Sequence, residues 1–200
     1  MGAIGRPLNI NYHTGQWLPD WHPWEDIRDY YVSERESGAA REIVPFELTW
    51  LNDIFGVPEP VACAKAKLSE LAADIDDIYH CLLRYPAGVL ASVTVEVLSR
   101  PRAARELNVI GTEGRLVFSG DENCVRHSNL GHPEWVRFDL KMGSVEKGYI
   151  NPEEPYIEEL SAFIRAFEKG QKTLYPHTLL EDAMILKTLC RLEELSGSAT

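Results

Sequence analysis

Closely spaced glycines are missing from this sequence: no two of its fourteen glycines are separated by a single residue. A dinucleotide-binding turn between a strand and a helix needs such glycines, because the backbone must approach the pyrophosphate closely. The glycine-lysine pattern of a phosphate-binding loop is missing as well. We therefore expect no cofactor-binding residue in this chain.

Cysteine is scarce and dispersed. Cys63, Cys81, Cys124 and Cys190 include no C-x-x-C pair, whereas a structural zinc site draws on closely spaced pairs. Small disulfide scaffolds are also much denser in cysteine. The spacing of the histidines adds no ligand set. We predict reduced thiols and no metal site.

Positive charge is scarce too, since 20 Lys and Arg stand against 31 Asp and Glu, a net charge of −11. A nucleic-acid partner would call for a clustered basic face. The one local concentration, Arg100, Arg102 and Arg105, is interpreted as a solvated strand end rather than an anion site. No apolar run approaches membrane-spanning length, and no secretion signal is visible. We expect a soluble, cytoplasmic protein that binds neither nucleic acid nor membrane.

Tryptophan and proline are instead concentrated in residues 17–24, which read WLPDWHPW. Prolines fix backbone angles and tryptophans bury large areas, so this segment predicts a structured loop. Before it, the alternation of residues 7–17 predicts a first strand. After it, residues 24–31 are predicted to be helical, because Pro23 and the following acids suit a helix start.

Three longer segments have helical periodicity. Residues 38–55 are predicted as a helix ended by Gly56 and Pro58, with an apolar face of Ile43, Phe46, Trp50, Leu51 and Ile54. Residues 153–169 and 178–196 are predicted as closing helices. The last of these has a capping box, Thr178 with Glu181, and a stripe of Leu179, Ala183, Leu186, Leu189 and Leu192.

Between these helices, residues 58–140 alternate with a period of two, most clearly in the run 89–98. Turns are predicted at 85–88 and 111–114, and shorter strands at 115–119, 122–127 and 134–140. With no helix between them, the strands are expected to pair as a meander. The predicted fold class is α+β: one large, mostly antiparallel open sheet with helices packed on one face.

Several strings, in this order, resemble the C-terminal domain of the Gfo/Idh/MocA oxidoreductase family. They are the opening GAIGRPLNI, the helix from Gly38 to Gly56, the hairpin NVIGTEGRLVF and the final helix HTLLEDAMILKTL. The run GQWLPDWHPWEDIRDYYV followed by REIVPFELTWL looks like one subgroup of that family. The resemblance covers nearly the whole chain.

The resemblance implies a two-domain enzyme in which an N-terminal Rossmann domain binds NAD or NADP, and this domain covers the active site and forms subunit contacts. Residues 1–200 are then a single substrate-binding and oligomerisation domain, without the dinucleotide-binding domain. The chain would be a fragment or a stand-alone gene product, and inactive alone.

One departure concerns proton transfer. The family's helix commonly reads D-x-G-x-H-x-x-D, and counting back from Gly56 places those positions at Glu42, Val44, Phe46 and Thr49. An imidazole can act as a general acid or base near neutral pH, whereas a phenyl ring cannot. The acid is kept as Glu42, but the catalytic group that replaces the histidine at Phe46 is unknown.

A sugar site is predicted where the tryptophan loop meets this helix, because aromatic faces stack on sugar rings while charged groups bond the hydroxyls. The alternative is a purely structural role, in which the tryptophans only hold the loop in place and Glu42 only interacts favourably with the helix dipole. The candidate substrate-binding residues are Trp21, His22, Arg28, Arg41, Glu42, Phe46 and Glu47.

The leading hypothesis is thus the substrate-side and assembly domain of an NAD(P)-dependent oxidoreductase acting on a sugar or sugar derivative. The alternative is a stand-alone oligomeric binding or scaffold protein derived from that domain. A hydrolase is disfavoured, since no G-x-S-x-G elbow is present. Apolar residues on both faces of 89–98 predict a homodimer or homotetramer through the sheet face.

Overall fold

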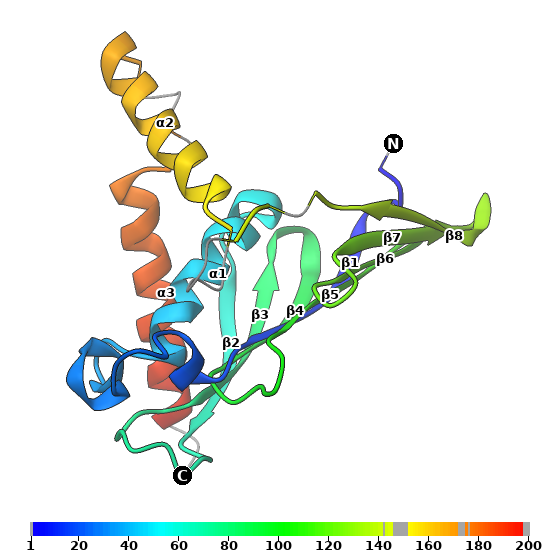
Figure 1. Ribbon diagram of the computed structural model, residues 1–200. Helices are drawn as coiled ribbons and strands as arrows, with labels where there is room; N and C mark the ends of the chain where they lie inside the picture. The colour runs from blue at the N-terminus through cyan, green and yellow to red at the C-terminus, as the bar shows by residue number, and fades with distance from the viewer. Residues whose placement is uncertain (1, 142, 146–151, 172–174, 176, 198–200) are drawn as a thin grey trace.

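The computed structural model describes residues 2–141, 143–145, 152–171, 175 and 177–197. In this part of the chain, one eight-stranded sheet carries helices on one face (Figure 1). The strands are β1 Pro7–Gly15, β2 Glu59–Ala66, β3 Ile78–Tyr85, β4 Val89–Glu96, β5 Ala104–Gly111, β6 Gly114–Ser119, β7 Cys124–Asn129 and β8 His132–Asp139. The α-helices are α1 Ala40–Phe55, α2 Glu154–Lys169 and α3 Leu179–Gly197. The predicted fold class is confirmed.

The strand order is β2-β3-β4-β1-β5-β6-β7-β8. The segments β2 to β4 and β5 to β8 are each antiparallel meanders, as expected. The first strand joins them, pairing parallel to β4 and antiparallel to β5. A single meander was therefore the wrong expectation, because β1 lies in the middle of the sheet rather than at its edge.

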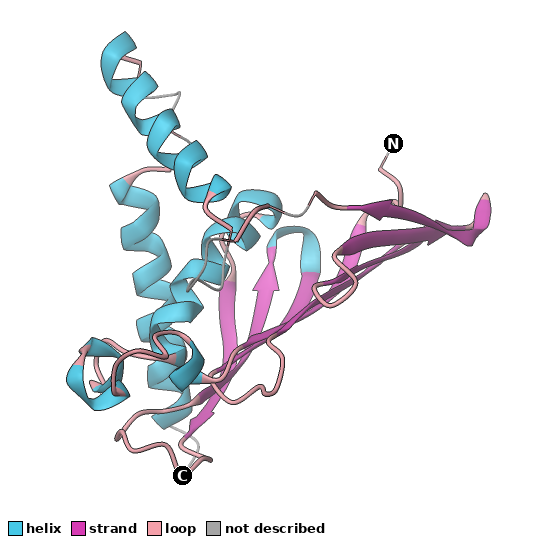
Figure 2. Cartoon of the chain, viewed as in Figure 1, coloured by secondary structure: helices cyan, strands magenta, loops and turns pink. Residues whose placement is uncertain are grey.

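The hydrophobic core lies between α1, α3 and one half of the sheet. On β3 and β4 every second side chain is buried against the helices, including Tyr79, Leu83, Ala91 and Val93. Beyond β5 the sheet continues away from α1 and α3 (Figure 2), and all eight residues of β8 are exposed. The alternation thus produces a core under only half of the sheet.

The apolar face predicted for helix α1 is confirmed only in part. The buried residues of the helix are Ala40, Val44, Glu47, Leu48 and Leu51. Of the predicted face, Leu51 is buried, and Ile43 and Trp50 are partly buried and pack against the core. Phe46 is 64% exposed and Ile54 is 62% exposed. Apolar residues occur around most of this helix, and periodicity alone did not select the side that packs on the sheet.

Residues 17–31, here called the aromatic segment, contain no α-helix, so the helix predicted at 24–31 is wrong. A short 3-10 turn at Ile27–Asp29 stands in its place, with one such turn before it at Leu18–Asp20 and another after it at Tyr31–Ser33. The carboxylate of Asp26 accepts a hydrogen bond from the Arg28 backbone N–H at 2.9 Å. That local side-chain contact caps a tight turn instead of starting a longer helix.

The capping box that starts α3 is confirmed. The Glu181 carboxylate accepts from the Thr178 backbone N–H at 2.7 Å, and the Glu181 N–H donates to Thr178 Oγ1 at 3.3 Å. The predicted stripe of α3 is confirmed only in part. Leu189 and Leu192 are buried against the sheet, whereas Leu179 and Leu186 are exposed.

A buried carboxylate fixes the connection that follows β4. Glu96 accepts hydrogen bonds from the backbone N–H groups of Leu98 and Ser99 and from the Ser99 hydroxyl, and His13 Nε2 lies 3.0 Å from its Oε1. The neighbouring strand leaves room for it, since a Cβ on Gly15 would lie 1.7 Å from Glu96 Oε1. The Ser99 carbonyl in turn accepts from the Trp17 N–H at 2.8 Å, which anchors the aromatic segment.

We expect Gly15→Ala to lower the free energy of unfolding by roughly 1–3 kcal/mol, the usual cost of overpacking a filled site. Gly197→Ala is the matched control, because nothing lies within 4 Å of its added Cβ. Urea unfolding of the two variants measures the difference, and equal stabilities would contradict this role of Gly15.

Candidate functional site

A cavity of about 760 Å³ lies where the aromatic segment, the N-terminal half of α1, the start of β5 and the start of α2 meet. Its lining comes from segments far apart in the sequence, so only the fold brings it together. The lining residues are Gln16, Trp21, His22, Trp24, Glu42, Ile43, Phe46, Glu47, Arg105, Glu153, Tyr156, Ile157 and Leu160.

Glu42, in the first turn of α1, is held in this wall by a neutral donor. The Tyr31 hydroxyl donates to Glu42 Oε1 at 2.9 Å, while Oε2 is buried without a hydrogen-bond partner. Burial raises the pKa of Glu42 above its ordinary value, and the hydrogen bond from Tyr31 acts in the opposite direction. Burial and Glu42 together raise the pKa of Tyr31 to about 12.

Glu47 is more deeply buried, with 6% of its surface exposed, and is fully engaged. Its Oε2 accepts from the Tyr12 hydroxyl and from Trp50 Nε1, each at 2.6 Å. The Arg105 guanidinium lies 3.7 Å from Oε1 and also donates to the Tyr12 hydroxyl at 3.3 Å. Burial and the Glu47 charge raise the pKa of Tyr12, so its hydroxyl stays a donor.

The aromatic segment forms the opposite wall. The His22 ring stacks on Trp24 and on Tyr30, with centroid separations of 5.1 and 4.8 Å, and its Nδ1 lies 2.7 Å from a Glu25 oxygen. Trp21 Nε1 and the Tyr30 hydroxyl are buried without a partner. Burial raises the pKa of Tyr30.

Unpartnered buried polar atoms therefore gather at this cavity. Among the described residues, the side-chain atoms of this kind are Trp21 Nε1, Tyr30 Oη, Glu42 Oε2 and His127 Nδ1, and only the last lies on a distant strand. Leaving a buried donor or acceptor unpaired costs free energy. Of these residues, Trp21 and Glu42 line the cavity, and a site whose lining residues keep an indole N–H and a carboxyl oxygen unpaired is suited to bind hydroxyl groups.

The structure brings Trp21, His22, Glu42, Phe46 and Glu47 together along this cavity. The other two candidates lie elsewhere. Arg28 forms an exposed ion pair with Asp26 at 2.5 Å. Arg41 binds both oxygens of Glu193 at 2.7 and 3.1 Å and so ties α1 to α3.

Sequence reasoning missed Arg105 as a lining residue and treated it as part of a solvated strand end. The alternation of β5 contained the signal, because Arg105 has the same parity as Leu107 and Val109, which face the helices. Of its predicted companions, Arg100 lies over the Trp17 ring at 4.1 Å from its centroid. The lining residues of α2 carried no recognisable signal.

No group of three or more His, Cys, Asp or Glu side chains within the described residues is arranged to hold a metal ion. The cysteines are all free. No helix among the described residues is long and apolar enough to cross a membrane.

A family model described as "GFO/IDH/MocA C-terminal domain" matches residues 1–117. Comparison with curated proteins finds no match. Three solved structures illustrate the structural likeness. An Agrobacterium radiobacter oxidoreductase in complex with NAD+, L-tartaric acid and magnesium has a TM-score of 0.79 at 13% identity, covering 100% of this chain and 57% of that one.

Levoglucosan dehydrogenase in complex with NADH and levoglucosan has a TM-score of 0.78 at 16% identity, covering 100% of this chain and 59% of that one. UDP-N-acetylglucosamine 3-dehydrogenase from Acidithiobacillus ferrooxidans has a TM-score of 0.62 at 12% identity, covering 98% of this chain and 55% of that one. At these identities the likeness shows the fold. This chain spans less than three fifths of the length of each.

We expect Tyr31→Phe to raise the pKa of Glu42 further, because the lost hydrogen bond favours the ionised carboxylate while burial persists. Carbon-13 NMR of the glutamate carboxyl groups against pH measures this directly. Tyr175→Phe, whose hydroxyl bonds Glu159 far along the chain, is the control. An unchanged or lowered Glu42 pKa in Tyr31→Phe would show that Tyr31 does not hold the ionised form.

Proposed function

The chain belongs to the GFO/IDH/MocA C-terminal domain family, and from this we propose that it is the substrate-side and assembly domain of an NAD(P)-dependent oxidoreductase acting on a sugar or sugar derivative. It requires a dinucleotide-binding domain for activity. The observation that carries the proposal is the cavity at which Trp21 and Glu42 keep buried polar atoms unpaired.

A carbohydrate-like substrate fits the chemistry of this cavity. Glu42 and Trp21 line the cavity, and a small side-chain rearrangement that opened the buried Glu42 oxygen or the buried Trp21 N–H would allow a ligand hydroxyl to bond to it. The exposed ring of Phe46 offers an apolar surface beside them. The structural neighbours that were solved with levoglucosan and with tartrate are in keeping with a hydroxyl-rich ligand.

No residue of this chain is assigned to the dinucleotide, because no glycine pair of the required spacing exists. When bound by its own domain, the nicotinamide would accept or supply the hydride. The part played by this chain is to bind and orient the hydroxyl-bearing carbon. Phe46 cannot take the hydroxyl proton, so among the candidate residues on α1 that task falls to Glu42 or is carried by the other domain.

The dinucleotide-binding domain is proposed to cover the apolar side of α2. This helix continues one wall of the cavity and buries only Ala166. An uncovered run of large apolar side chains is typical of a surface that another domain or chain occupies. The exposed residues are Tyr156, Ile157, Leu160, Phe163, Ile164 and Phe167.

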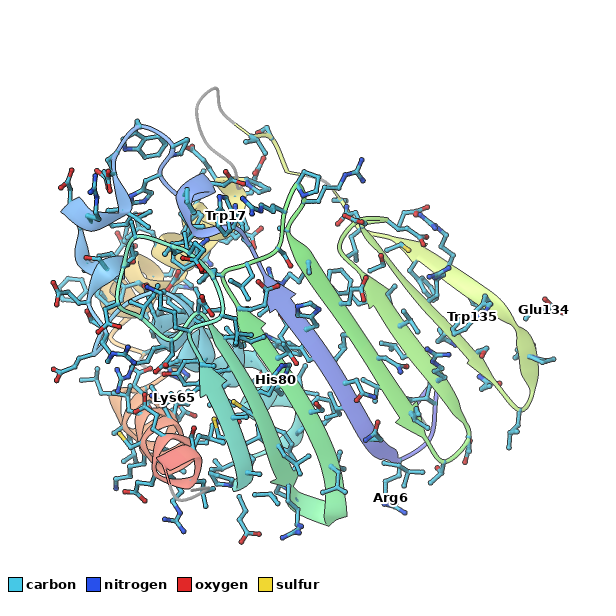
Figure 3. All side chains as sticks on the ribbon, turned by 90° about the horizontal axis from the view of Figure 1, so that it is seen from below. Arg6, Trp17, Lys65, His80, Glu134 and Trp135 are labelled. Atoms are coloured by element: carbon cyan, nitrogen blue, oxygen red, sulfur yellow. The ribbon has the colours of Figure 1, made fainter. Side chains whose placement is uncertain are left out.

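Assembly is proposed on the opposite face of the sheet, as a homodimer or homotetramer. Figure 3 looks onto this face, with His80 near its middle and Trp135 toward the β8 edge. Half-exposed Leu82 and Leu90 lie on it on the neighbouring strands β3 and β4, and half-exposed Ile110 lies on β5, separated from Leu90 by Asn9 of β1. A flat face of this kind, in a sheet covered on the other side only, is suited to packing against a second copy.

The division of labour between domains is tested by calorimetric titration with NADH and NADPH. We expect no binding by these 200 residues and micromolar binding, on the order of the usual cofactor affinity, once a dinucleotide-binding domain is joined to them. Binding by this chain alone would contradict the assignment of the cofactor to another domain. Binding by neither protein would favour the stand-alone binding or scaffold protein.

Assembly is tested with Leu90→Glu, which places a charge in the middle of the proposed interface. We expect light scattering to give a dimer or tetramer for the unaltered chain and a shift toward the 22.6 kDa monomer for the variant. Leu68→Glu, at an exposed position in the loop between β2 and β3, is the matched control. An unaltered chain that is monomeric would overturn the proposed interface.

A further inference from the structure

The charges that line the cavity are unbalanced. Among its described lining residues, Glu42, Glu47 and Glu153 carry carboxyl groups, whereas Arg105 is the only lysine or arginine. A wall with this charge balance repels an anionic ligand and favours a neutral or positively charged one.

The one guanidinium is already committed. Glu47 is buried, and its other donors, the Tyr12 hydroxyl and the Trp50 indole, are neutral, so Arg105 is the only cation that the structure places against it. A ligand carboxylate or phosphate that drew Arg105 away would leave a buried carboxylate without a counter-charge, which is strongly unfavourable. The exposed part of Arg105 can still contact a ligand anion, but Glu47 already offsets part of its positive charge.

Glu42 discriminates in the same direction. Within the described part of the chain, the one hydrogen-bond donor to the Glu42 side chain is the neutral Tyr31 hydroxyl, and burial already opposes the ionisation of Glu42. An anionic group beside it would add like-charge repulsion to that cost. A neutral hydroxyl, by contrast, can donate to Oε2 and relieve an unpaired acceptor.

We infer that this cavity selects an uncharged, hydroxyl-rich ring and discriminates against sugar acids and sugar phosphates. The inference rests on the proposed function and narrows its substrate class. The structural neighbours do not decide this point, because levoglucosan is neutral whereas tartrate and a UDP-sugar are anions. The inference of a neutral ligand therefore rests on the charged residues that line the cavity of this chain.

Matched ligand pairs test the inference. D-glucose with D-glucuronate, and D-galactose with D-galacturonate, differ by one carboxylate on the same ring, and levoglucosan adds a second neutral ring. Binding is measured by saturation-transfer NMR on this chain, and kcat/KM is measured on the chain joined to a dinucleotide-binding domain. We expect the affinity and the kcat/KM for each neutral sugar to be about tenfold higher than for its acid at low salt. The ratio should be smaller at high salt.

Glu153→Gln removes one negative charge from the cavity wall and leaves the Arg105–Glu47 pair unchanged. It should therefore lower the ratio of the kcat/KM for the neutral sugar to that for its acid. Glu158→Gln, on the same helix but outside the cavity lining, should leave the ratio unchanged. Equal or tighter binding of the acids would overturn the inference while leaving the proposed function standing. Failure of every sugar in both proteins would remove the proposed function itself.

Discussion

The buried carboxylate of Glu47 is the constraint on which the candidate site depends. It receives hydrogen bonds from Tyr12 on β1 and Trp50 on α1, and it lies beside Arg105 on β5. An ion of this kind is tolerated in the interior only where donors surround it. The position of α1 over the sheet is therefore fixed by a polar contact as well as by apolar packing. Glu42, five residues earlier on the same helix, is positioned as a consequence.

The rest of the architecture follows from unequal covering of the sheet. The helices α1 and α3 bury the inner side of β2, β3, β4 and β1, and Arg41 with Glu193 links the two helices above it. The strands β6 to β8 continue the same sheet without that cover, and α2 contributes little to the core. The apolar surface left uncovered supports the proposal that other domains or copies complete the fold.

Much of the fold could be read from the sequence because the signals were periodic. The run of β4 alternates so regularly that it was predicted as a half-buried strand, and the capping box of α3 marked a helix start with specific residues. Two things escaped. The pairing of β1 with β4 is a long-range choice that no local pattern encodes. The buried side of α1 was misjudged because Phe46 and Ile54 are as apolar as the residues that pack.

The candidate site was predictable to a different extent. Trp21, His22, Glu42, Phe46 and Glu47 were selected from the sequence as residue types that suit a sugar, and the fold places them around one cavity. Arg28 and Arg41 were selected on the same grounds, but nearby carboxylates engage them elsewhere. A charged side chain pairs with the opposite charge that the folded structure brings closest to it. Because that partner can lie far away in the sequence, a local pattern does not reveal it.

The exposure of Phe46 is explained if its ring contacts a ligand in the cavity. An apolar ring that neither packs in the core nor carries a proton is costly to leave in water, yet it stands at the mouth of a cavity with unpaired polar atoms. Such a pairing of apolar surface and hydrogen-bonding groups matches the two faces of a sugar ring, whose carbon-bound hydrogens and hydroxyls need different partners.

Structure and selectivity are finally linked through Arg105. The charge of the guanidinium beside the buried Glu47 is partly offset before any ligand arrives, so the ion pair that helps to seat α1 also weakens the attraction of the only described cation of the cavity wall for an anion. The remaining carboxyl groups then set the sign of the local potential. Preference for a neutral ligand is thus not an added feature of the pocket, but a consequence of how the helix that forms it is attached to the sheet.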